Sequence, residues 1–176
     1  NVIRCNRLLG LQWAIAVFGK SPDLEAVDVQ ILDNYIHSIS LGRDVQEILE
    51  TFPFPAIALT WVRSTKVAGN NIAYAEVGIL HGISRDLQVL QNNILNIDLF
   101  AIFLKGARKG SISHNNISNA VGGITILDLD LDHKAHANST KLEIFFSQIL
   151  SFSTFFPSLE AALGPLKEAP SQGLTP

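Results

Sequence analysis

Three aspartates near the end of the regular part of the sequence are the residues whose spacing most suggests metal chemistry. Asp128, Asp130 and Asp132 alternate with leucines. Residues spaced by two along a strand point to the same side, so the three carboxylates would share one face. Because Ca²⁺ prefers carboxylate oxygens, this triad is a candidate calcium site. The alternative is a solvated strand face, since the twelfth position of an EF-hand loop would be Ser139 rather than Glu.

A basic cluster precedes the aspartates. Lys105, Arg108 and Lys109 fall on a turn between two expected strands. Their charges could hold an acidic sugar or a phosphate, and the alternative is a solvated loop.

Three aromatic residues form a second candidate binding group. Phe52, Phe54 and Trp61 lie in one irregular stretch of the sequence, where loops that carry binding residues are often found. Their rings could provide platforms on which sugar rings stack.

A short repeat predicts the elements that must position these groups. Each copy reads apolar, two arbitrary residues, Asn, one arbitrary residue, apolar, and the copies are centred on Asn6, Asn34, Asn70, Asn92 and Asn115. The last three asparagines are 22 and 23 residues apart, a period typical of stacked coils. This period is too short to hold a helix between strands, since a βαβ unit needs about 30 residues. A parallel β-helix therefore fits best, with a leucine-rich repeat as the alternative.

Each Asn motif is followed by a second pattern, a small residue, then Ile, any residue and an apolar residue. The pairs expected to point inward are Ile15 with Val17, Ile39 with Leu41, Ile102 with Leu104, and Ile124 with Ile126. Leu80 and Phe103 would point outward and would need a covering element. The asparagines are expected to be structural, because Asn tolerates left-handed turns and stacked amides form ladders.

The period is interrupted, and it fades toward the C-terminus. The larger surplus falls in residues 42–63, which we expect to be a side insertion to the coils of residues 1–132. Residues 133–163 contain a strongly apolar, partly helical stretch that is expected to cap the stack, and residues 164–176 read as a loose tail. A membrane span is the alternative for the apolar stretch, disfavoured by its polar residues and Pro157.

Composition excludes several classes of protein. Apolar residues make up 47% of the chain and charged residues only 16%, which excludes a disordered chain and fits strands buried on both faces. The net charge of −3 argues against nucleic acid as a partner. Cys5 is the only cysteine, so no internal disulfide can form.

The repeat resembles the right-handed parallel β-helix proteins of the pectin-lyase-like superfamily over residues 1–132. The resemblance implies an all-β fold, a single right-handed parallel β-helix of about five coils, and an extracellular or cell-surface location. It also implies a polysaccharide partner and a lyase or glycoside hydrolase activity. The superfamily's catalytic signatures are missing, because the chain has only His81-Gly82 in place of a Gly-His-Gly turn.

Two functions from different classes follow as expectations. The first is a polysaccharide-binding β-helix, with or without lyase or hydrolase activity, for which Ca²⁺ is the only cofactor considered. The second is a non-catalytic scaffold module of a larger protein or assembly. In that case a homo-oligomer or a longer chain would cover the coil ends.

Overall fold

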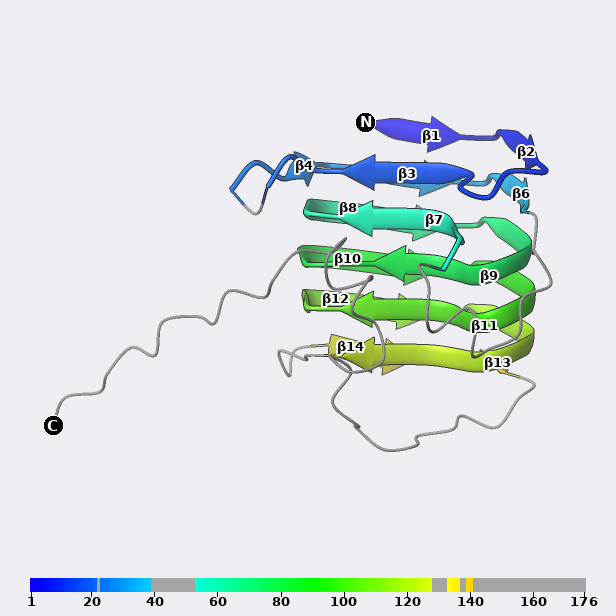
Figure 1. Ribbon diagram of the computed structural model, residues 1–176. Coiled ribbons are helices and arrows are strands. Elements are labelled where there is room, and N and C mark those ends of the chain that lie inside the picture. The colour runs from blue at the N-terminus through cyan, green and yellow to red at the C-terminus, as the bar shows by residue number, and fades with distance from the viewer. Residues whose placement is uncertain (22, 39–52, 128–132, 137–138, 141–176) are drawn as a thin grey trace, which may run out of the picture.

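The chain is a stack of parallel β-strands (Figure 1). The computed structural model describes residues 1–21, 23–38, 53–127, 133–136 and 139–140, and these contain strands but no helix. The strands form two sheets, and the chain passes between them repeatedly. Sheet A contains β1 (Val2–Arg4), β4 (Ala26–Val27), β5 (Gln30–Leu32), β8 (Val62–Ala68), β10 (Ser84–Leu90), β12 (Ala107–Ser113) and β14 (His133–His136). Sheet B contains β2 (Arg7–Leu9), β3 (Ile15–Phe18), β6 (Tyr35–His37), β7 (Pro55–Thr60), β9 (Asn71–His81), β11 (Asn93–Lys105), β13 (Asn116–Leu127) and β15 (Ser139–Thr140).

All strand pairings between coils are parallel, and successive coils stay in register. Val67 of β8 lies between Ile31 of β5 and Val89 of β10, and Ile112 of β12 follows in the same column. This is the arrangement expected of a parallel β-helix, so the prediction of an all-β, parallel, coiled fold is confirmed at that level.

The long strands of sheet B bend and contribute to two faces. The first part of β9 pairs with β6, whereas its last part pairs with β7. In β11 the register with both β9 and β13 shifts by one residue between Ile97 and Phe100, as at a β-bulge. We call the part formed by β2, β6 and the first residues of β9, β11 and β13 face B1. The part formed by β3, β7 and the last residues of the same long strands is face B2.

Branched aliphatic side chains fill the space between the faces. Ile72 and Ile94 point inward from face B1, and Ile79 and Ile102 from face B2, and all four have no exposed surface. Burying one such side chain contributes roughly 1.5–3 kcal/mol, and the columns repeat this contribution at every coil.

A strand that the sequence analysis did not predict lies between the first coil and β9. The predicted inward pair Ile39 and Leu41 lies outside the described residues, whereas β7 pairs with both β3 and β9. Ile57 of β7 pairs with both Ile15 and Ile79, and Leu59 pairs with Val17. The sequence Ala56-Ile57-Ala-Leu59 repeats the small-Ile-x-apolar pattern, so the predicted insertion 42–63 extended too far and included β7 and the start of β8.

The role assigned to the corner asparagines was partly wrong. They stack as predicted, but the left-handed residue is the one before each Asn. The φ angles at these positions are 56° at Cys5, 53° at Asp33, 67° at Gly69, 54° at Gln91 and 57° at His114. The left-handed residue turns the chain, and the asparagine that follows stays in an ordinary conformation with its amide inside.

The coils continue past the predicted boundary at residue 132. β14 pairs with β12 and β15 pairs with β13, with Ile112 opposite Ala135 and Ile117 opposite Thr140. The predicted cap and tail beyond residue 140 lie outside the described residues. Within the described residues, no helix has the length and apolar character needed to span a membrane.

Leu80 and Phe103 occupy one column of face B2, on the side away from the core residues Ile79 and Ile102, as predicted. Both are nevertheless buried, at 2% and 1% exposed, and the Phe103 ring lies 5.1 Å from that of Phe100.

Candidate binding faces

The asparagine ladder fixes the position of every coil. The backbone N–H and the Nδ2 group of Asn34 both donate to Oδ1 of Asn70, at 3.0 Å each. Asn70 donates to Asn92 in the same way, and Asn92 to Asn115. Each Nδ2 from Asn34 onward also donates to a backbone carbonyl of the preceding coil, such as Ile31 O for Asn70. These amides are buried and satisfied within the scaffold, so they are not ligand-binding groups.

The residue after each ladder asparagine lies on the outside of face B1. The register aligns Arg7, Tyr35, Asn71, Asn93 and Asn116 in one column. The amides of this column form a second, outer ladder, in which Asn93 Nδ2 donates to Asn71 Oδ1 at 3.3 Å and Asn116 Nδ2 to Asn93 Oδ1 at 2.8 Å. Neighbouring members are one strand spacing apart, roughly 4.8 Å.

Aromatic side chains accompany the outer ladder on the N-terminal coils. Tyr35 is 41% exposed and Tyr74 is 46% exposed. The His37 ring lies 4.6 Å from the Tyr74 ring, and the Arg7 guanidinium lies 5.8 Å from the centre of the Tyr35 ring. Each tyrosine ring therefore has one neighbouring side chain beside it on the surface.

A left-handed residue marks the bend between faces B1 and B2. Tyr74, Asn96 and Asn119 have φ angles of 60°, 53° and 54°. Asn119 Nδ2 donates to Asn96 Oδ1 at 2.6 Å, which adds a further amide pair beside the outer ladder. Together these residues form what we call the aromatic–amide strip, which comprises Arg7, Tyr35, His37, Asn71, Tyr74, Asn93, Asn96, Asn116 and Asn119.

The chemistry of the strip suits a ligand rich in hydroxyl groups. Tyrosine and histidine rings offer flat apolar surfaces, and each amide both donates and accepts hydrogen bonds. No member of the strip carries a carboxylate, so the strip itself holds no acid–base pair of the kind that glycoside hydrolysis uses.

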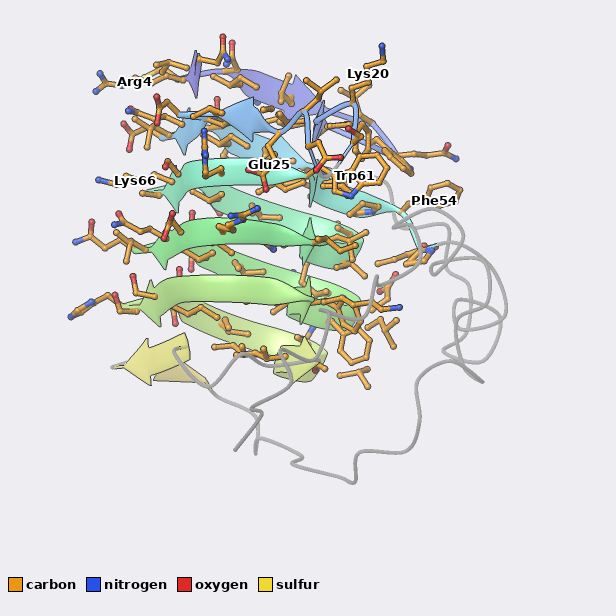
Figure 2. All side chains as sticks on the ribbon, turned by 90° about the vertical axis from the view of Figure 1, so that its left-hand side faces the viewer. Arg4, Lys20, Glu25, Phe54, Trp61 and Lys66 are labelled. Atoms are coloured by element: carbon orange, nitrogen blue, oxygen red, sulfur yellow. The ribbon has the colours of Figure 1, made fainter. Side chains whose placement is uncertain are left out.

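Sheet A carries a second candidate, an open groove of about 400 Å³. Its lining residues are Asp28, Gln30, Ser64, Thr65, Lys66, Asp86 and Gln88. Asp28, Ser64 and Asp86 have φ angles of 53°, 53° and 56° and occupy one column, so the sheet is kinked there. Figure 2 faces sheet A and shows Lys66 pointing away from the stack at one edge and Trp61 at the other.

Ion pairs flank this groove. Glu25 Oε2 lies 3.8 Å from Arg63 Nε, and Glu25 Oε1 lies 3.6 Å from Arg85 Nε. The Glu25 side chain is only 11% exposed, whereas both arginine side chains are about half exposed. Glu25 therefore partly neutralises one arginine on each of two coils. The solvent-facing sides of both arginines stay exposed.

The aromatic residues singled out in the sequence do not form one platform. Phe52 lies outside the described residues. Phe54 precedes β7 and Trp61 follows it, so the rise of an extended strand separates them by roughly 20 Å. Trp61 is a half-buried corner residue with a φ of 52°, and its Nε1 is buried with no acceptor among the described groups.

The backbone of the predicted basic cluster belongs to two strands rather than to one turn. Lys105 ends β11 and is 6% exposed, so it is not a free surface charge. The backbone of Arg108 and Lys109 lies in β12, not on a turn, and Arg108 pairs with Arg85 across sheet A. Asp128, Asp130 and Asp132 lie outside the described residues. Over the rest of the chain that the structure describes, no group of three potential metal ligands comes together.

Sequence reasoning missed both tyrosines. For Tyr35 the available signal was the position between the ladder Asn and the following apolar residue, which points outward and holds Arg7, Tyr35 and the outer amides. Tyr74 stands at the bend, four residues after Asn70, and that position carried no such signal.

Comparison with protein families, with curated proteins and with solved structures finds no match for this chain.

Proposed function

We propose that the chain is a polysaccharide-binding β-helix that holds an extended sugar polymer along face B1. The exposed Tyr35 and Tyr74 rings beside the outer amide ladder are the observation that carries this proposal. A polymer lying across the coils would meet a ring or an amide at each step of roughly 4.8 Å. Because Arg7 and His37 already contact the rings, little side-chain ordering would be needed on binding.

The proposal includes a right-handed winding, about five coils and membership of the pectin-lyase-like superfamily. Parallel crossovers are right-handed in nearly all proteins, which supports the handedness. The parallel pairing and the buried asparagine ladder support the superfamily. An extracellular or cell-surface location accompanies the proposal, because extended polysaccharides are found there.

Binding and cleavage can be measured on the same samples. The chain would be titrated by calorimetry with an acidic polymer, polygalacturonate, and a neutral polymer, xylan, each with Ca²⁺ and with a chelator. New reducing ends would report cleavage, and ultraviolet absorbance of unsaturated uronates would separate a lyase from a hydrolase. We expect saturable binding to at least one polymer, and a Ca²⁺ requirement would support an ion at Asp128, Asp130 and Asp132.

A variant pair ties the binding to the strip. Replacing both tyrosines, Tyr35→Ala with Tyr74→Ala, should weaken binding by at least about fivefold, because each ring contact contributes about 0.5–1.5 kcal/mol. Val121→Ala is the matched control, since Val121 is 55% exposed and lies outside the strip. Equal affinities for the two variants would contradict the proposal.

The second candidate function is a scaffold module, and one observation favours it. The first coil leaves Val2, Leu9 and Phe18 between 49% and 60% exposed, as expected for a surface that another part of a larger protein or assembly covers. A chain that bound none of the polymers and cleaved none would leave this candidate in place.

A further inference from the structure

Two arginines on neighbouring coils of sheet A share one acid. Arg63 of β8 lies opposite Arg85 of β10 in the parallel register, so their backbones are one strand spacing apart, roughly 4.8 Å. Each arginine contacts a different oxygen of one carboxylate, Arg63 Nε at 3.8 Å from Glu25 Oε2 and Arg85 Nε at 3.6 Å from Glu25 Oε1. We call these residues the arginine–glutamate triad. Two positive charges and one negative charge leave the triad with a net charge of +1.

This alignment of arginines is unfavourable for folding. Like charges directly opposite each other on paired strands are destabilising. The register nevertheless repeats the alignment, because it places Arg108 of β12 opposite Arg85. Asp28 and Asp86 line the groove of sheet A, which neither arginine of the triad lines, and within the described residues neither aspartate forms an ion pair with an arginine. A costly alignment that recurs from coil to coil indicates a function for the charge.

The hydrogen-bond donors of the triad are accessible. A guanidinium carries five N–H groups in a planar fork. Within the part of the chain that the structure describes, neither Arg63 nor Arg85 donates a hydrogen bond to another residue. The Arg63 and Arg85 side chains are 48% and 54% exposed, whereas the Glu25 side chain is 11% exposed. Glu25 therefore contacts both arginines from the protein side, at Nε, and the terminal N–H groups remain for a ligand.

We propose that the triad binds a tetrahedral oxyanion, a phosphate or sulfate group carried by a small molecule or a glycan. Arginine contacts to such groups are frequently bidentate. A phosphate group presents three strong acceptor oxygens, enough for both forks at once, whereas a carboxylate presents only two oxygens. The bound anion would bridge two coils and relieve the repulsion between Arg63 and Arg85. Glu25 acts as a positioning residue that orients the two guanidinium groups.

A titration of the full chain tests the site with known ligands. Proton–nitrogen nuclear magnetic resonance follows the Nε–H signals of Arg63 and Arg85 as inorganic phosphate, glucose 6-phosphate, inorganic sulfate or dextran sulfate is added. Sodium acetate and uncharged dextran are the comparisons. We expect saturable shifts with at least one phosphate or sulfate ligand, at least about tenfold tighter than with acetate. Added salt should weaken binding, because the arginines are exposed.

The ligand series also separates the possible sources of the anion. Glucose 6-phosphate binding more tightly than inorganic phosphate would identify a phosphorylated small molecule as the ligand class. Dextran sulfate binding more tightly than inorganic sulfate, with no binding of dextran, would identify a sulfated glycan. Either result supports the oxyanion site.

Three variants of the chain locate the interaction. Arg85→Gln removes one fork and should weaken binding by at least about tenfold. Arg85→Lys keeps the charge but loses the fork, and should weaken binding by at least about threefold. Arg4→Gln is the matched control, because Arg4 is an exposed arginine of sheet A that pairs with Asp33 at 3.3 Å, and it should change affinity by less than about twofold. Thermal melting checks that all three variants are folded.

Saturable binding of phosphate or sulfate that depends on Arg85 and not on Arg4 supports the proposal. It is overturned if no ligand gives saturable shifts, if acetate binds equally well, or if Arg85→Gln and Arg4→Gln have equal effects. Full affinity of Arg85→Lys would overturn it too, because a point charge would then suffice. Replacing Tyr35 and Tyr74 by Ala should leave oxyanion binding unchanged, so failure here and failure of polysaccharide binding on face B1 are distinguishable.

Discussion

Asn70 donates two hydrogen bonds to the Oδ1 atom of Asn92, one from its backbone N–H at 3.0 Å and one from its Nδ2 at 2.9 Å. The second Nδ2 proton contacts Ile31 O at 2.9 Å, so the buried amide is fully used. A single side chain therefore joins three successive coils, and its loss would leave partners in each of them unsatisfied.

Replacing the central member of the ladder should be strongly destabilising. Asn92→Ala removes the acceptor of both Asn70 donors and the donor to Val67 O. We expect a loss of about 3 kcal/mol in the free energy of unfolding, because buried groups would lack partners. Urea denaturation followed by circular dichroism measures it. Asn116→Ala, in the exposed outer ladder, should cost less than about 0.5 kcal/mol, and a similar loss for both would contradict this account of the ladder.

The left-handed corners predict a stabilising substitution. Gln91 is exposed, has a φ of 54° and occupies the position where Gly69 stands one coil earlier. Gln91→Gly removes the left-handed strain and should raise stability by about 0.5 kcal/mol, net of the added flexibility of the unfolded chain. Gln88→Gly, in the extended part of β10, should instead lower stability by about 1 kcal/mol. Thermal melting compares the stability of the two variants. A loss of stability for Gln91→Gly equal to that for Gln88→Gly would contradict the left-handed conformation assigned to Gln91.

Close approach between coils makes Gly78 difficult to replace. A Cβ atom there would lie 2.5 Å from Ala101 O and 3.0 Å from Ile94 Cγ2. Since backbone must move to relieve the first contact, Gly78→Ala should cost about 2 kcal/mol in urea denaturation. Gly122→Ala is the comparison, because its nearest neighbour is the Phe100 ring, a side chain that can turn aside. A greater loss of stability for Gly122→Ala than for Gly78→Ala would show that the spacing between coils is not what excludes a side chain at position 78.

Glu25 should stabilise its own loop more than the whole fold. Glu25→Gln removes the ion pairs with Arg63 and Arg85, and because both arginines are half exposed the loss should stay below about 1 kcal/mol. The local effect should be larger, with faster hydrogen exchange at Lys20 and Leu24, whose amides close the adjacent turn. Exchange rates unchanged at these two amides would contradict a role for Glu25 in holding the loop.

The Tyr74 ring, not its hydroxyl, should matter for sugar binding. Tyr74→Phe keeps the contact with His37 and should change affinity by less than about twofold, whereas Tyr74→Ala should lower it about fivefold. Calorimetric titration with the polymer that binds the unmodified chain compares them. Equal losses of affinity for Tyr74→Phe and Tyr74→Ala would show that the hydroxyl group, and not the ring face, makes the contact with the sugar.

The repeat and the core could be predicted because they obey local rules. Asn34, Asn70 and Asn92 stack in the predicted column, and Ile102 with Leu104 points inward as alternation requires. The strand that contains Ile57 was not predicted. The sequence before it departs from the 22-residue repeat by a length that the pattern does not give, so the strand fell out of the expected spacing. The left-handed residues were missed because a sequence motif does not say which of two adjacent corner residues turns the chain.

The candidate site was harder to predict because it depends on which outward positions come together. Phe54 and Trp61 are the two ends of an extended segment of eight residues. They are therefore far apart in space although they are close in sequence. Tyr74 and His37 are distant in sequence yet their rings touch, because the register of β6 and β9 brings them onto neighbouring coils. No local pattern contains that information.

The division of labour at each corner has a consequence for how such a molecule can change. The inner amide is committed to holding the architecture, whereas the very next position tolerates Arg7, Tyr35 and Asn71 alike. The outward residues of face B1 can therefore be substituted one at a time. The fold stays the same, because the buried asparagine before each of them already fixes its position in the stack.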